Sequence, residues 1–155
     1  MTSARVETPE DFPQPWSGEE WEQVIEAGFA LVNATAHEHD PRYPEALEAM
    51  RSLIADLRAR YGEHPILIET LADFEDGPDR RIELYGLAIE RATALGRPTA
   101  SIRMSLAKTL VEYCGKKEEA LVQLRACADE VMRNGDEHDK NEHAELVSEC
   151  ETHAI

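Results

Sequence analysis

The fold of this chain is decided by residues 101–132, SIRMSLAKTLVEYCGKKEEALVQLRACADEVM. Mostly apolar residues recur there at helical spacing on both sides of a short Gly115-Lys116-Lys117-Glu118 turn. Those before the turn are Ile102, Leu106, Thr109, Leu110 and Tyr113, and those after it are Ala120, Leu121, Leu124, Cys127, Ala128 and Val131. Gly115 stands where a helix C-cap favours a residue that tolerates positive φ. The stretch predicts a helical hairpin, which needs similar neighbours to bury its apolar faces.

The same alternation of helical pattern and stop signal continues along the chain. Ser17 and Glu20 have the spacing of a capping box, so we expect the first helix to begin there and end near residue 36. Later helices are predicted over about 44–61, 65–74, 79–95, 101–114, 118–134 and 139–153, with Asp79 as one cap and Thr99 or Ser101 as another. The sequence therefore predicts an all-α fold of about seven helices, arranged as three antiparallel hairpins and a C-terminal capping helix.

The chain of 155 residues is long enough for one domain with a substantial core. Residues 1–16 contain Pro9, Pro13 and Pro15, so we expect an extended lead-in that is attached to the body by Phe12 and Trp16. Residues 17–155 are predicted to form a single helical domain.

Residues 101–132 resemble a tetratricopeptide repeat. The matching positions are Met104, Ala107, Val111, Gly115, Ala120, Leu124 and Cys127, whereas Lys108 stands where the family favours a small residue. Ala46 and Ala120 occupy equivalent places 74 residues apart, which fits two repeats of about 37 residues. The resemblance implies a right-handed superhelix in which the first helix of each hairpin lines a concave surface. A plain helical bundle is the alternative.

The charge balance limits the partners that this chain can attract. Acidic residues number 32 against 16 basic ones, for a net charge of −16, so nucleic acids and anionic membranes should be repelled. A basic protein surface is the natural complement, although acidic charge can also serve solubility alone.

Three cysteines within helical patterns suggest buried, reduced thiols. With no secretory signal and no apolar run long enough to span a membrane, we expect a cytoplasmic protein.

Two histidine clusters are candidates for metal or catalytic chemistry. They consist of His37, His39 and Asp40, and of His138, Asp139, Glu142 and His143. Neither has the spacing of a zinc or di-iron site, and the chain contains no phosphate-binding loop and no nucleophile elbow. We therefore expect solvated side chains at both clusters, no enzymatic activity and no cofactor. A ligand-sensing or enzymatic helical bundle is the less favoured alternative.

A partner-binding surface is predicted on the first and third helices. Trp21, Ile25, Phe29 and Val32 form a stripe at helical spacing, in which we expect Trp21 and Ile25 to be core and Phe29 to be free. Acidic residues gather nearby, and only Arg5 and Arg42 are basic in the first 50 positions. The predicted binding residues are Glu19, Glu22, Glu26, Phe29, Glu69 and Asp73. An apolar centre with an acidic rim is the composition of a surface for a basic protein.

These expectations favour a non-enzymatic interaction protein that binds neither nucleic acid nor membrane. Its sharpest form is a cytosolic immunity protein or antitoxin that neutralises a basic toxin. A chaperone or adaptor dedicated to one partner protein is the alternative within the same class.

Overall fold

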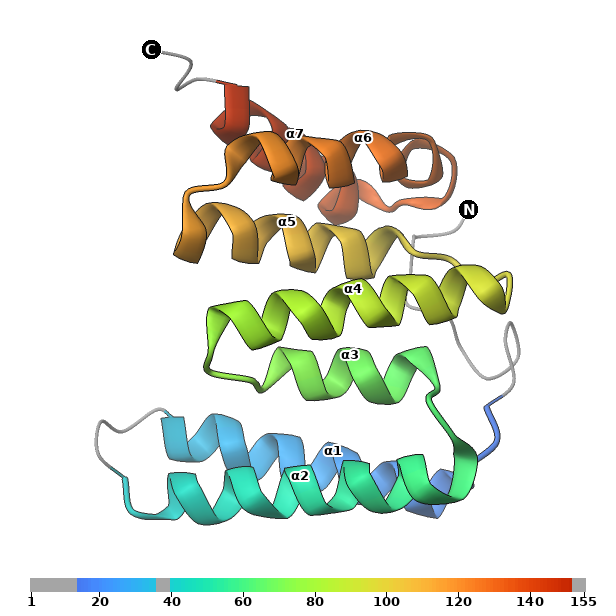
Figure 1. Cartoon of the computed structure of the whole chain (residues 1–155), viewed down its shortest axis with the longest axis vertical. Coiled ribbons are helices and arrows are strands. Elements are labelled where there is room, and N and C mark those ends of the chain that lie inside the picture. Colours follow the sequence, from blue (N-terminus) through green and yellow to red (C-terminus); the bar gives the residue numbers. More distant parts are fainter. Residues whose placement is uncertain (1–13, 36–39, 152–155) are drawn as a thin grey trace.

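The computed structural model describes residues 14–35 and 40–151, and within these ranges every regular element is a helix. In chain order the helices are α1 (Gly18–Thr35), α2 (Arg42–Tyr61), α3 (Pro65–Asp73), α4 (Pro78–Ala94), α5 (Ala100–Cys114), α6 (Lys117–Asn134) and α7 (Glu137–Glu151). The predicted all-α fold of three hairpins and a terminal helix is confirmed. Figure 1 shows α3, α4 and α5 following one another along the long axis of the molecule, with α1 and α2 side by side at one end and α6 and α7 at the other. The right-handed superhelix stays a prediction.

Local signals set several helix ends where they were expected. The Ser17 N–H donates to Glu20 Oε1 at 2.8 Å and the Glu20 N–H donates to Ser17 Oγ at 3.1 Å, which is the predicted capping box. Gly115 ends α5 with φ of 63°, and the Lys116 N–H donates to the Leu110 carbonyl at 3.0 Å. The left-handed conformation explains why glycine stands at this position.

Other helix starts differ from the prediction. Asp79 lies in the first turn of α4 and is not its cap, because Gly77 takes that place and its N–H donates to Glu75 Oε2. Thr99 precedes α5, but its hydroxyl makes no capping hydrogen bond. The carboxylate of Glu130 on α6 accepts instead from the N–H groups of Thr99 and Ala100, at 3.2 and 3.0 Å. A helix start is thus satisfied by a residue about thirty positions away, which no local pattern predicts.

Helix α7 begins two residues earlier than expected. The Asp139 N–H donates to Asp136 Oδ1 at 2.8 Å, and the Asp136 N–H donates to Asp139 Oδ2 at 3.3 Å. The two aspartates therefore cap the helix reciprocally, with Asp139 inside its first turn. Leu146 and Cys150 are the buried residues of this helix, so only a narrow stripe of α7 faces the core.

The core has two parts that meet at α3. One part joins α1, α2 and α3, and its buried residues are Trp16, Val24, Leu31, Leu47, Met50, Ile54, Leu57 and Leu67. The other runs from α3 through α7 and includes Ile68, Ala72, Leu84, Tyr85, Ala107 and Leu124. Because Leu67 and Ile68 are successive residues of α3 that face different parts of the core, this short helix joins the first hairpin to the rest. No helix in the described ranges is long and apolar enough to cross a membrane.

We predict that Gly135→Ala destabilises the protein, whereas Gly86→Ala stabilises it. A Cβ at Gly135 would lie 2.3 Å from the Val131 carbonyl oxygen, so the end of α6 must shift, at a cost of about 1–3 kcal/mol. A Cβ at Gly86, inside α4, would meet no atom within 4 Å apart from the adjacent residues and backbone of its own helix, and alanine there should add about 1 kcal/mol. Urea denaturation of both variants measures the difference, and equal midpoints would contradict the close approach at Gly135.

Candidate partner-binding surface

Helix α1 carries an uncovered apolar stripe, which we define as Ile25, Phe29 and Val32. The side chains are spaced at i, i+4 and i+7, so they lie on one face of the helix. They are 46%, 65% and 58% exposed, whereas Val24, Leu31 and Ala34 of the same helix are buried. Phe29 is free, as predicted. The expectation that Ile25 is core is wrong, because the neighbouring helices cover only the face of α1 that contains Val24 and Leu31.

A row of carboxylates runs beside the apolar stripe. Glu19, Glu22 and Glu26 are all exposed, and their spacing of three and four residues places them along one face of α1. We call these three residues the acidic ridge. Helix α1 contains no lysine or arginine, and none occurs between positions 6 and 41 of the sequence. The surface of this helix therefore combines exposed apolar area with negative charge that no basic side chain of α1 offsets.

The structure separates the predicted binding residues into two groups. Glu19, Glu22, Glu26 and Phe29 share the outer side of α1, whereas Glu69 and Asp73 belong to α3 in the next layer of the stack (Figure 1). The side chain at the end of α3, Phe74, reaches α1 and lies against the backbone of Gly28.

Asp73 forms a link between α3 and α4. Its Oδ1 accepts a hydrogen bond from the Tyr85 hydroxyl at 2.5 Å. Desolvation raises the pKa of Asp73, and this effect outweighs the opposing influence of the Tyr85 hydrogen bond and the Arg81 charge. The arrangement indicates a packing role for Asp73 between α3 and α4.

Trp16 holds the start of α1 against α2 and α3. Its ring stacks on Trp21 with centroids 5.4 Å apart and meets the edges of Tyr61 and His64 at 6.2 and 4.8 Å. The predicted attachment by Trp16 is confirmed, while Phe12 lies outside the described residues. Glu20 adds a polar link, because it accepts from the Tyr61 hydroxyl at 2.7 Å and pairs with Arg60. These contacts hold the start of α1 against α2 and α3.

His64 caps α3 in its neutral form. Its Nδ1 accepts the N–H of Ile66 at 3.2 Å, which requires an unprotonated nitrogen. Burial and the charge of Arg97 lower the pKa of His64 to about 4. Between pH 6.5 and about 4 the unfolded chain therefore binds more protons at this position than the folded one, and stability falls as the pH falls.

We predict that His64→Asn flattens this part of the pH profile. Asparagine can cap a helix but does not titrate, so the variant should be spared a loss of up to about 3 kcal/mol that the wild type suffers between pH 7 and pH 4. Urea denaturation at several pH values measures the difference between the two proteins. Parallel profiles over this range would show that the folded state does not disfavour the protonated imidazole.

The two histidine clusters form no metal site within the described chain. No group of three or more potential ligands is assembled in residues 14–35 and 40–151, and His37 and His39 lie outside these ranges. His138 lies 3.7 Å from a carboxylate oxygen of Glu142 on the same helix. His143 Nε2 lies 2.7 Å from the Leu124 carbonyl oxygen, so its ring joins α7 to α6.

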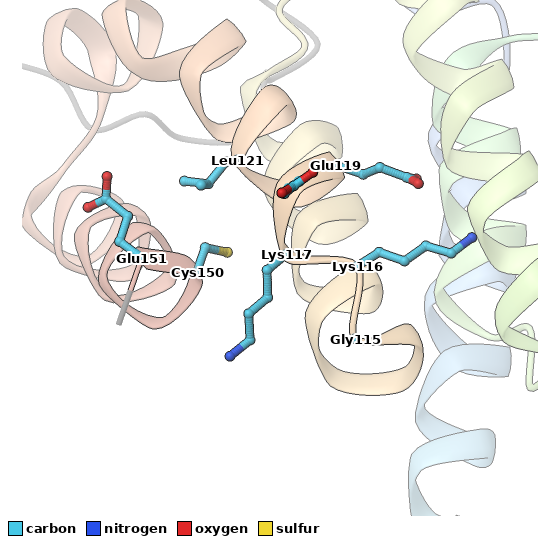
Figure 2. A pocket seen from close by; sticks show the side chains of 8 residues that line it. Gly115, Lys116, Lys117, Glu119, Leu121, Cys150 and Glu151 are labelled. Atoms are coloured by element: carbon cyan, nitrogen blue, oxygen red, sulfur yellow. The ribbon is translucent and has the colours of Figure 1, made fainter. Parts of the chain in front are cut away.

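A hollow of about 650 Å³ lies where the α5–α6 turn meets the end of α7 (Figure 2). Lys116, Lys117, Leu121 and Cys150 are among its lining residues. The two lysine side chains point in different directions and do not converge on one ligand position. Burial raises the pKa of the Cys150 thiol, which disfavours the reactive thiolate. The hollow therefore lacks both a built anion site and an activated nucleophile.

Comparisons with protein-family models, with curated proteins and with solved structures each gave no match.

Proposed function

We propose that this protein acts by binding another protein whose contact surface is basic. The observation that carries the proposal is the apolar stripe beside the acidic ridge, on a helix without lysine or arginine. Apolar contact area supplies affinity once water is displaced, and complementary charge speeds encounter and selects the partner. Binding, and not turnover, is the activity that such a surface supports.

The sharpest form of the proposal is a cytosolic immunity protein or antitoxin. A net charge of −16 on 155 residues creates a negative field around the whole molecule. A toxin that acts on nucleic acid needs a basic surface for its phosphate contacts, and an acidic protein can occupy that surface in place of the substrate. Contacts such as those of Trp16 and Glu20 hold α1 in place, so little ordering is needed on binding.

The test begins with capture of the partner from the native cell on the tagged full-length protein, with identification by mass spectrometry. The expected partner is a basic protein encoded next to the gene for this chain, it should be released as salt is raised, and its toxicity should disappear on co-expression. A partner without a basic surface, or a complex insensitive to salt, would overturn the proposal.

We predict that the double substitution Glu22→Lys and Glu26→Lys slows association with this partner by about tenfold at low salt, with a smaller effect on dissociation. The matched control is Glu118→Lys and Glu119→Lys, because both glutamates are exposed in the first turn of α6 and the change in net charge is identical. Stopped-flow or surface-based kinetics separate the two rate constants. An equal loss in both double variants would assign the effect to overall charge and not to the acidic ridge.

A further inference from the structure

Within the proposed binding function, we propose that the apolar stripe of α1 receives one basic amphipathic helix of the partner. This inference rests on the proposed function and names the structural element that the α1 surface recognises. The exposed large apolar side chains in the described residues are Ile25, Phe29, Val32, Leu95, Tyr113, Val122 and Met132. Only α1 presents three of them on one helical face. The others lie at the end of α4, on α5, and at two positions on α6 that are ten residues apart.

The shape of the stripe indicates a helical occupant. From Ile25 to Val32 the helix rises about 10 Å, and the three side chains form a single column in which successive residues are about one turn apart. A partner helix with apolar residues at i, i+3 or i+4, and i+7 can place its own column in contact with this one. Addition of a strand requires an open sheet edge, and the described ranges contain no sheet.

The negative charge of the acidic ridge determines which residues should lie beside the apolar column of the partner helix. Glu22 and Glu26 lie alongside Phe29, and Glu19 extends the acidic ridge by one turn towards the start of α1. A partner helix with lysine or arginine next to its apolar column would therefore place positive charge against this ridge. An acidic or neutral helix of the same apolar pattern would leave the three carboxylates without a complement.

The same charges disfavour the other possible occupants. A second copy of this chain carries a net charge of −16 and would bring one acidic ridge towards another. The segment 1–13 contains Glu7, Glu10 and Asp11 against the single base Arg5, so it is also acidic. Charge complementarity thus favours a separate, basic partner.

The test uses three synthetic peptides of about 18 residues, each labelled for fluorescence anisotropy. The first is an amphipathic helix of leucine and lysine, the second has the same composition in an order without an apolar face, and the third replaces every lysine with glutamate. The full-length protein should bind the first peptide at least about tenfold more tightly than the second, and should not bind the third.

Variants then locate the binding site for the first peptide. Phe29→Asp and the milder Phe29→Ala should each weaken binding, by about tenfold or more for Phe29→Asp. The matched control is Val122→Asp, because Val122 is 60% exposed on α6 and should leave affinity unchanged. Circular dichroism verifies that the variants stay folded, which the exposure of Phe29 leads us to expect.

Several outcomes would overturn this inference. Equal affinity for the ordered and scrambled basic peptides would show that charge alone acts, which leaves the proposed function intact and removes the helical occupant. Loss of binding in Val122→Asp but not in Phe29→Asp would place the site elsewhere. Dimers that dissociate in Phe29→Asp would assign the stripe to a second copy, and a gain in affinity on removal of residues 1–13 would assign it to that segment.

Failure of the proposed function would give a different result, namely no salt-dependent association with any cationic protein or peptide.

Discussion

Replacing Trp16 with alanine is expected to lower the free energy of unfolding by about 3–5 kcal/mol. The indole is only 7% exposed and contacts three rings, those of Trp21, Tyr61 and His64. Truncation removes apolar contact area and leaves a cavity where the start of α1 meets α2 and α3, and the surroundings can fill it only in part. Urea denaturation followed by circular dichroism measures the loss.

Two further variants make the Trp16 result interpretable. Trp16→Phe keeps an aromatic ring, and the indole N–H has no hydrogen-bond partner among the described residues, so the loss should be about 1 kcal/mol. Met132→Ala truncates a side chain that is 66% exposed on α6, and the change should stay within about 0.5 kcal/mol. A loss below about 1 kcal/mol for Trp16→Ala would mean that this ring does not hold α1 to the body.

Tyr85→Ala should cost a similar amount, about 3–5 kcal/mol, through loss of an aromatic ring from the second part of the core. Tyr85 is 1% exposed on α4, and the guanidinium of Arg81 lies 6.0 Å from its ring centroid. Its hydroxyl donates to Asp73, so the side chain also fixes α4 to α3. Loss of Tyr85 should therefore weaken the packing of α4 against α3, the helix at which the two parts of the core meet.

The matched variant Tyr85→Phe separates the ring from the hydroxyl. It keeps the packing but deprives the desolvated Asp73 carboxylate of a donor, and we expect a loss of about 1–3 kcal/mol. Addition of Asp73→Asn completes a double-mutant cycle that measures the coupling between the two side chains. Equal losses for Tyr85→Phe and Tyr85→Ala would show that the ring contributes nothing, contrary to its complete burial.

The candidate surface could be predicted in part. The helical spacing of Ile25, Phe29 and Val32 is visible in the sequence, and so are the nearby glutamates. Helix α1 has apolar residues on more than one face, however, and spacing alone does not say which face the neighbouring helices cover. The prediction was therefore right for Phe29 and wrong for Ile25, which is 46% exposed. In the same way, Asp73 has an acidic side chain like its neighbours, and only the position of Tyr85 shows that its carboxylate is engaged.

The sequence by itself determined the helices and most of their ends. The capping box joins Ser17 to Glu20, and Gly115 ends α5 with a positive φ. Both signals involve residues that are close together in the chain, so these helix ends follow from the order of residues alone. Tertiary structure alone decided that Glu130 caps α5, that His64 is held neutral beside Trp16, and that the face of α1 with Phe29 meets water. These features depend on which side chains from distant helices come within contact range, and the helical period of one segment contains no information about that packing.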